Sequence, residues 1–289
     1  ENHHKGACPL CGGGVLGEEL HGGVVGGALY TNIENVHSSV SVTVDRVNNK
    51  DYAATAGGVV GEMIYGSVYH CSNTGAITAP QQEKVGGVAG YASGTYIRES
   101  YNTADITAGA STGGVVGHFI AYGTVVGVMS CYNTGDVSGA GSGVGGVAGS
   151  AVASKKGDTA GMAVLSSLYN RGDVTAQHTV GGIVGYVAGG YSSAAKEITG
   201  CVNTGAVSSS SHNAGGIVGY IYGQVTVDSC YNRGSCTSGS YRAGGITAYL
   251  ASSSAAVKNC YTTGETKVAY GSDSHAVIGN KSSGTVENC

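Results

Sequence analysis

Gly113-Gly114-Val115-Val116-Gly117, followed by Cys131-Tyr132-Asn133-Thr134-Gly135, is one copy of a double motif that recurs along this chain and decides its fold. Copies of the first half begin 27 to 36 residues apart. A repeat of this length is typical of a solenoid, a propeller or a modular array. The copies of the first half lie at residues 22–26, 57–61, 86–90, 113–117, 145–149, 181–185 and 215–219, with weaker copies at 244–248 and 275–279.

The amino-acid composition points to a narrow interior. The chain has 289 residues, enough for one large all-β unit, with 53 Gly, 2 Pro, one Phe and no Trp. A core with so few large side chains must rely on Val, Ile and Ala, which suit the small space between closely spaced strands. The net charge of −4 and the lack of a Lys/Arg cluster argue against a nucleic-acid partner. The chain has no apolar run of about eighteen residues, so we expect no membrane-spanning helix.

The position two residues before the Asn of the second motif indicates a buried slot of modest size. Most copies have Cys there, whereas Val36 and Leu168 fill the same position in two others. Such an exchange is typical of a small apolar space rather than of a reactive thiol. Because side chains alternate along a strand, the next position, often Tyr, then faces outward and the Asn faces inward. We expect the inward Asn residues to bond to one another and to the turn backbone. They are Asn73, Asn102, Asn133, Asn170, Asn203 and Asn232.

Each repeat therefore contains the pattern of three short strands and no helical pattern, which predicts an all-β parallel β-solenoid (β-helix) with one repeat per rung. We expect about eight to nine rungs, wound right-handed, over residues 21–289, preceded by an N-terminal segment or cap at 1–20. The repeats vary most in length at 150–167 and 189–200, where we expect loops on one side. A propeller is the alternative fold, but it normally needs four strands per blade and longer repeats.

The paired signatures G-G-V-V-G or G-G-I-V-G and C-Y-N-T-G resemble the GLUG-motif repeats of large bacterial surface proteins, over residues 22–289. These proteins include adhesin-like proteins and the non-catalytic region of IgA-cleaving metallopeptidases. Here Val or Ile stands where the family name implies Leu, and none of the nine His lies in an H-E-x-x-H motif. The resemblance implies an extracellular bacterial repeat region rather than a peptidase.

Cys8 and Cys11, with His3 and His4 nearby, have the residue types and the spacing of metal ligands. They could hold Zn²⁺ alone or together with another chain. A local disulfide, or a terminal cap with free thiols, explains the same residues, so we expect no resident cofactor.

Cys201, Cys230, Cys260 and Cys289 occupy the same column on consecutive rungs. A strand spacing of about 4.8 Å lies within the Cα separation that a disulfide needs. Disulfide bridges from rung to rung and buried free thiols are therefore both compatible with this spacing. The exchange of Cys for Val and Leu in the same column favours free thiols.

Asp105, Asp136 and Asp173 also lie on successive rungs. Stacked carboxylates could bind Ca²⁺ or cleave glycans, as in polysaccharide enzymes built on β-helices. They would repel one another unless a cation or solvent intervenes, and an exposed Asp after a turn Gly is common. We favour solvated turn residues.

The outward column of the second motif predicts an aromatic stripe. Tyr side chains can stack on sugar rings or on a neighbouring fibre, and they can equally shield the sheet and pair across rungs. The stripe consists of Tyr101, Tyr132, Tyr169, Tyr231 and Tyr261.

These features favour a non-enzymatic structural protein located outside the cell or on its surface. It would act as a rigid stalk, or as a filament subunit whose copies stack head to tail, because open solenoid ends invite strand pairing. The sequence stops at the Cys column, in the middle of a rung, which fits either a piece of a longer repeat protein or such stacking. An adhesin that binds glycans or a host surface is the alternative, and a β-helix enzyme is the second alternative.

Overall fold

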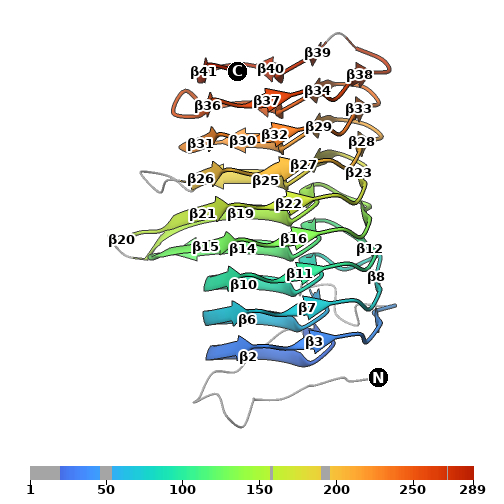
Figure 1. Ribbon diagram of the computed structural model, residues 1–289, viewed down its shortest axis with the longest axis vertical. Coiled ribbons are helices and arrows are strands. Elements are labelled where there is room, and N and C mark those ends of the chain that lie inside the picture. The colour runs from blue at the N-terminus through green and yellow to red at the C-terminus, as the bar shows by residue number, and fades with distance from the viewer. Residues whose placement is uncertain (1–19, 46–53, 157–158, 190–195, 272) are drawn as a thin grey trace.

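The structure is a computed structural model that describes residues 20–45, 54–156, 159–189, 196–271 and 273–289, and these ranges form strands and no helix. The strands stack into a tall solenoid with the first rung at one end and the last rung at the other (Figure 1). Eight complete rungs and a partial ninth follow one another along the chain. Strands of neighbouring rungs pair in parallel, with motif residue opposite motif residue. The prediction of an all-β parallel β-solenoid is therefore confirmed.

The strands of one rung belong to four different sheets, numbered here in chain order. Sheet 1 contains the residues that lead into the G-G-x-x-G motif. Its nine strands are β1 (Leu20–Gly22), β5 (Thr55–Gly57), β9 (Val85–Gly86), β13 (Thr112–Gly113), β18 (Val144–Gly145), β24 (Thr179–Gly181), β29 (Asn213–Gly215), β34 (Arg242–Gly244) and β39 (Asp273–His275).

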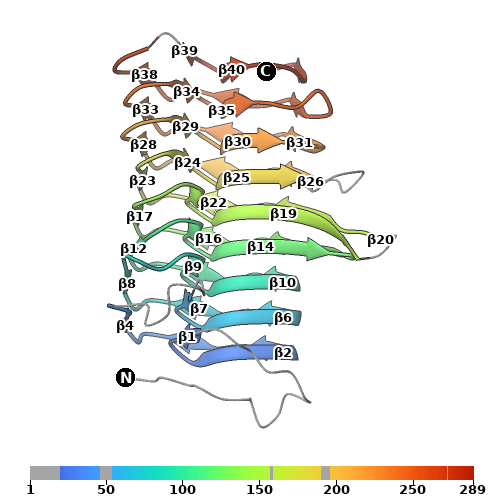
Figure 2. The ribbon, with the colours of Figure 1, turned by 180° about the vertical axis from the view of Figure 1, so that it is seen from behind.

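Sheet 2 is the widest and wraps around the narrow edge of the solenoid, called the apex below (Figure 2). In rungs 1 to 3 one long strand bends at the apex and covers both broad faces. These strands are β2 (Val25–Glu34), β6 (Val60–Tyr69) and β10 (Ala89–Arg98). The bend falls at residues with left-handed backbone, namely Tyr30, Tyr65 and Gly94.

From rung 4 onward the outgoing and returning arms of sheet 2 are separate strands. The outgoing arm consists of β14 (Val116–Tyr122), β19 (Ala148–Lys156), β25 (Val184–Gly189), β30 (Val218–Tyr222), β35 (Thr247–Leu250) and β40 (Ile278–Lys281). The returning arm consists of β15 (Val125–Met129), β21 (Met162–Ser166), β26 (Lys196–Thr199), β31 (Val225–Asp228), β36 (Ala256–Lys258) and β41 (Thr285–Glu287). A short strand, β20 (Thr159–Ala160), pairs antiparallel with β19 beyond the apex.

Sheets 3 and 4 hold the second motif and the short β run that follows it. Sheet 3 consists of β3 (His37–Ser38), β7 (Ser72–Asn73), β11 (Tyr101–Asn102), β16 (Tyr132–Asn133), β22 (Tyr169–Asn170), β27 (Val202–Asn203), β32 (Tyr231–Asn232) and β37 (Tyr261–Thr262). Sheet 4 consists of β4 (Val42–Thr43), β8 (Ile77–Ala79), β12 (Ile106–Ala108), β17 (Val137–Gly139), β23 (Val174–Ala176), β28 (Val207–Ser209), β33 (Cys236–Ser238) and β38 (Thr266–Val268).

The structure differs from the sequence prediction in the number of strands per rung. A rung has four strands up to rung 3 and at least five from rung 4 to rung 8, rather than three. The segments at 150–167 and 189–200, expected to be loops, include β19, β20, β21 and β26. Their residue types vary from rung to rung, because backbone pairing and small buried residues such as Ala163 suffice to hold them. The motifs mark only the parts of the rung where residue identity is constrained.

The G-G-x-x-G motif forms the corner between sheets 1 and 2. Both middle residues are buried there, as Val115 and Val116 show, because the chain turns between them. The second Gly is required by close approach: a Cβ on Gly114 would lie 2.1 Å from the Gly146 carbonyl oxygen and 2.4 Å from Cγ of Asn133. The motif thus lets one rung rest directly on the next while two apolar side chains per rung enter the core.

Candidate functional site

The inward Asn residues form one continuous hydrogen-bonded column. Nδ2 of Asn102 donates to Oδ1 of Asn133 at 2.8 Å, and Nδ2 of Asn133 donates to Oδ1 of Asn170 at 2.9 Å. Nδ2 of Asn133 also donates to the Gly135 carbonyl oxygen at 2.7 Å, which closes the turn within the same rung. All six Asn side chains are fully buried. The column ends at Thr262, whose Oγ1 lies 3.5 Å from Nδ2 of Asn232. Its role is structural, because buried amides with satisfied partners fix the register of the rungs.

The Cys column lies in the same corner, with its thiols pointing at backbone carbonyl groups. Sγ of Cys131 donates to the Met129 carbonyl oxygen at 3.2 Å and lies 3.7 Å from the Ile97 carbonyl oxygen of the rung below. Ser100, in the same column, makes the equivalent bond to the Arg98 carbonyl oxygen at 2.8 Å. The slot takes Cys, Ser, Val or Leu, and at Ser100 and Cys131 the side-chain donor bonds to a backbone carbonyl group.

The cysteines of the described residues are free thiols, and those of rungs 2 to 8 are buried. They are Cys71, Cys131, Cys201, Cys230, Cys236 and Cys260, with the exposed Cys289 following on the last rung. Burial raises the pKa of Cys131 to about 12 and that of Cys236 to about 12. Such thiols are poor nucleophiles, because the thiolate is the reactive form. The described thiols are unbridged in this structure, and the choice between buried thiols and bridges from rung to rung stays a prediction.

The residue before the Cys column has left-handed backbone on every rung, a feature that sequence reasoning missed. Ser130, for example, has φ of 52° and Gly200 has φ of 62°. The column consists of Asn35, His70, Glu99, Ser130, Ser167, Gly200, Ser229, Asn259 and Asn288. Three Asn and one Gly occur in this column, and because these residue types tolerate left-handed backbone, they could have indicated it from the sequence.

The predicted Tyr stripe lies on the outer face of sheet 3, half-buried or exposed. Tyr101 stacks on Tyr132 with ring centroids 4.7 Å apart, and Tyr231 stacks on Tyr261 at 5.3 Å. The Tyr169 hydroxyl lies 3.3 Å from the Thr204 hydroxyl on the next rung. Val202 interrupts the stripe between these pairs. The rings stack along the rod as an aromatic surface.

The predicted Asp column bonds to the backbone of the next rung. Oδ1 of Asp105 accepts from the Asp136 backbone N–H at 2.9 Å, and Oδ1 of Asp136 accepts from the Asp173 N–H at 2.8 Å. Oδ1 of Asp173 accepts from the Ala206 N–H at 2.8 Å. The three carboxylates are exposed, and within the described ranges no group of three or more His, Cys, Asp or Glu has an arrangement that could hold a metal ion. The Zn²⁺ candidates Cys8, Cys11, His3 and His4 lie outside the described residues.

A second, interrupted aromatic column follows the outgoing arm of sheet 2, at the residue after five of the G-G-x-x-G motifs. Tyr91 stacks on His118 with centroids 5.7 Å apart, and Tyr186 stacks on Tyr220 at 5.3 Å. Nδ1 of His118 hydrogen-bonds the Ser150 hydroxyl on the next rung. Burial, with a smaller contribution from the Lys84 ammonium, lowers the pKa of His118 to about 4. Sequence reasoning aligned the motifs but not this flanking position, where Tyr recurs at 91, 186, 220 and 249.

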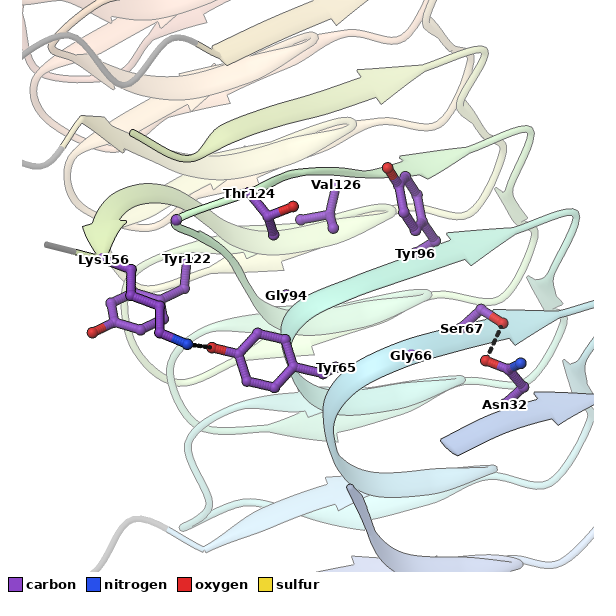
Figure 3. A pocket seen from close by; sticks show the side chains of 11 residues that line it. Asn32, Tyr65, Gly66, Ser67, Gly94, Tyr96, Tyr122, Thr124, Val126 and Lys156 are labelled. Atoms are coloured by element: carbon purple, nitrogen blue, oxygen red, sulfur yellow. Dashed lines mark hydrogen bonds between the residues drawn. The ribbon is translucent and has the colours of Figure 1, made fainter. Parts of the chain in front are cut away.

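A hollow of about 560 Å³ lies at the apex, where rungs 1 to 3 meet the wider rungs 4 and 5 (Figure 3). Three tyrosines, Tyr65, Tyr96 and Tyr122, lie around it together with Lys156. The other lining residues are Asn32, Gly66, Ser67, Gly94, Gly123, Thr124 and Val126. No sequence motif marks these residues, because they come from five different rungs and from the most variable part of the repeat.

In the part of the chain that the structure describes, no helix is long and apolar enough to cross a membrane.

The fold and the ladders define a repeat protein of the β-solenoid class. Residues 19–43 match the family model described as the GLUG motif. This match extends over β1, β2, β3 and β4, so the motif corresponds to one complete rung of the solenoid. The expected relation to GLUG-motif repeats is therefore confirmed, and the other rungs repeat the same four-sheet pattern. Comparison with curated proteins and with solved structures gave no match.

Proposed function

We propose that this chain is a rigid, non-enzymatic spacer that works outside a bacterial cell or on its surface. The observation that carries the proposal is the continuous core: one cluster of buried apolar side chains extends from Ala28 in rung 1 to Cys260 in rung 8. Parallel strand pairs join neighbouring rungs along the rod, and the Asn column joins rungs 2 to 7, so bending the rod requires breaking many bonds together. At about 4.8 Å per rung, eight rungs give a rod about 40 Å long. The GLUG-motif match supports a structural repeat protein.

Small-angle X-ray scattering over a range of protein concentrations tests the spacer. A stalk gives a rod whose length does not change with concentration. Head-to-tail stacking, the alternative form of the proposal, gives a length that grows with concentration at constant cross-section. A flexible chain, whose scattering shows no constant cross-section, would contradict both forms.

The absence of catalysis has a separate test. Oδ1 of each of the three aspartates, Asp105, Asp136 and Asp173, accepts a backbone N–H, which supports a structural role for the column. We expect no product from polyuronates or neutral glycans. A product that disappears in Asp136→Asn would overturn the non-enzymatic part of the proposal.

An adhesin is the second candidate, because the tyrosines of sheet 3 give the rod an exposed aromatic surface. Tyr132 and Tyr169 are each 37% exposed, and Tyr261 is 62% exposed. Aromatic rings pack well on the C–H faces of sugars. A glycan array with the wild type and Tyr132→Ala tests this candidate, and binding by neither protein would count against it.

A further inference from the structure

The hollow at the apex arises from a change in rung width. The outgoing part of β10 pairs with β14 only as far as Ser93, which lies opposite Ile120. The next pair of rungs continues further, since β14 and β19 remain paired out to Tyr122 opposite Ser154. Rungs 4 and 5 therefore overhang the narrower rungs below, and Figure 1 shows β19 and β20 projecting beyond β10. The hollow lies under this overhang and is open to solvent.

Tyr65 is held beside the hollow at a conformational cost. Its φ is 54°, in the left-handed region, where a bulky residue is a genuine outlier. The neighbouring rung has Gly94 at this position, and a Cβ there would lie 2.5 Å from Cδ1 of Tyr65. Tyr30, also left-handed with φ of 52°, stacks under the ring at 5.0 Å. Strained residues that the surroundings hold in place cluster at ligand-binding sites.

Lys156 brings a positive charge to the same place from rung 5. Its Nζ lies 3.4 Å from the Tyr65 hydroxyl and 5.3 Å from the centroid of the Tyr65 ring. Gly123 makes room for it, since a Cβ at that position would lie 2.3 Å from Cβ of Lys156. Within the described ranges no carboxylate forms an ion pair with Lys156. The ammonium is therefore available to an anionic ligand.

The remaining walls combine rings with hydrogen-bonding groups (Figure 3). Asn32 and Ser67 bond to each other at 3.0 Å on the lower side, and Thr124 and Val126 line the hollow from rung 4. Tyr96 is fixed by a bond from its hydroxyl to the Val125 carbonyl oxygen at 2.7 Å. Hydroxyl and amide groups beside aromatic rings suit a polyhydroxylated ligand better than a purely apolar one.

We propose that the apex hollow binds a saccharide that carries a negative charge, a uronic acid or a sulfated sugar. Lys156 contacts the charged group, the rings of Tyr122 and Tyr96 pack against the sugar, and Asn32 and Ser67 bond to its hydroxyls. The volume of about 560 Å³ lies within the usual range for small-ligand sites, about 300 to 1,000 Å³. This site lies on sheet 2 at the apex, away from the tyrosine stripe of sheet 3, and it does not depend on the spacer function.

The test is a chemical-shift titration of the isotope-labelled wild-type chain with three disaccharides: a galacturonic acid dimer, a sulfated galactose dimer and a neutral galactose dimer. We expect millimolar binding of at least one anionic sugar, about fivefold tighter than the neutral sugar, as an exposed ion pair gives. The sugar that binds identifies carboxylate or sulfate as the recognised group. Shifts are expected for residues of rungs 1 to 5 at the apex, and added salt should weaken the binding.

Lys156→Gln should remove the preference for the anionic sugar, while the melting temperature stays unchanged because the side chain is exposed. Lys258→Gln, which removes a partly exposed lysine that pairs with Glu287 on another part of the rod, should bind as the wild type does. Tyr132→Ala should also leave this binding intact, which separates the apex site from the adhesin candidate. Equal binding of the neutral sugar, full binding by Lys156→Gln, or no shift with any of the three sugars would overturn the proposal.

Discussion

Nδ2 of Asn102 lies 2.8 Å from Oδ1 of Asn133, and the same bond joins each Asn of the column to the next one. Removal of one member takes a hydrogen-bond partner from groups on two other rungs. In Asn133→Ala, Oδ1 of Asn170 loses its donor on one side and Nδ2 of Asn102 loses an acceptor on the other. On the same rung, the Gly135 carbonyl oxygen loses its side-chain donor. Buried polar groups without partners are costly, so we expect the free energy of unfolding to fall by about 3 kcal/mol. Urea denaturation followed by circular dichroism measures the change.

Thr134→Ala is the matched control, because it shortens the next side chain of the same motif outside the Asn column. We expect it to change the free energy of unfolding by less than about 0.5 kcal/mol. Equal effects of Asn133→Ala and Thr134→Ala would mean that the column contributes nothing beyond ordinary packing.

The motif residues predicted the fold because each of them meets its own copy on the next rung. Val115 and Val147 are both fully buried at the same corner, and Asn102 and Asn133 are bonded in register. Because equivalent residues of neighbouring rungs lie on one another, the geometry of the solenoid can be read from the repeats in the sequence. The returning arm of sheet 2 was missed because Val126, Ala163 and Lys196 share a column without sharing chemistry.

The apex hollow was not predictable from the repeat for a related reason. Tyr65 belongs to rung 2, Tyr96 to rung 3 and Lys156 to rung 5, and the hollow exists only because the rungs differ in width. Alignment of repeats emphasises what the rungs share, whereas this site depends on how they differ. The left-handed backbone at Tyr65 has no signal in the residue type itself, which is unfavourable there.

Ser130 provides a test of the left-handed column. An ordinary residue in this conformation is about 1 to 2 kcal/mol less stable than Gly. Gly is also more flexible in the unfolded chain, and this flexibility offsets about 0.5 to 1 kcal/mol of the gain in folding stability. We therefore expect Ser130→Gly to raise the free energy of unfolding by up to about 1 kcal/mol. Ser130→Val should lower it, because a β-branched residue fits this region worst. If both variants lower stability equally, the backbone at Ser130 does not carry this strain.

The buried thiol of Cys131 predicts how stability depends on alkaline pH. Burial raises its pKa from 9 in the unfolded chain to about 12 in the folded chain, so the folded state keeps the proton that the unfolded state loses. The resulting stability is complete below about pH 9 and is lost as pH rises toward about pH 12. Relative to Cys131→Val, the wild type should lose about 2 kcal/mol between about pH 9 and about pH 11. Denaturant unfolding of both proteins across this range measures the difference, and parallel curves would contradict it.

His118 predicts the opposite dependence on the acid side. Its pKa falls from 6.5 in the unfolded chain to about 4 in the folded chain, chiefly because the half-buried ring is shielded from water beside Tyr91. Between these two values the unfolded state binds more protons than the folded state, so acid favours unfolding. The stability that the neutral ring provides is complete above about pH 6.5 and is lost as pH falls through about pH 4.

His118→Gln removes this titration while it keeps a polar group near the Ser150 hydroxyl. We expect the variant to be less stable than the wild type at neutral pH, because the stack with Tyr91 is lost. From about pH 7 to about pH 4 the wild type should lose up to about 3 kcal/mol more than the variant, since each pKa unit corresponds to about 1.4 kcal/mol. Carboxylates that titrate in this range affect both proteins and cancel in the comparison. Urea unfolding of the two proteins at several pH values gives the difference, and a constant gap would show that His118 is protonated as easily in the folded solenoid as in the unfolded chain.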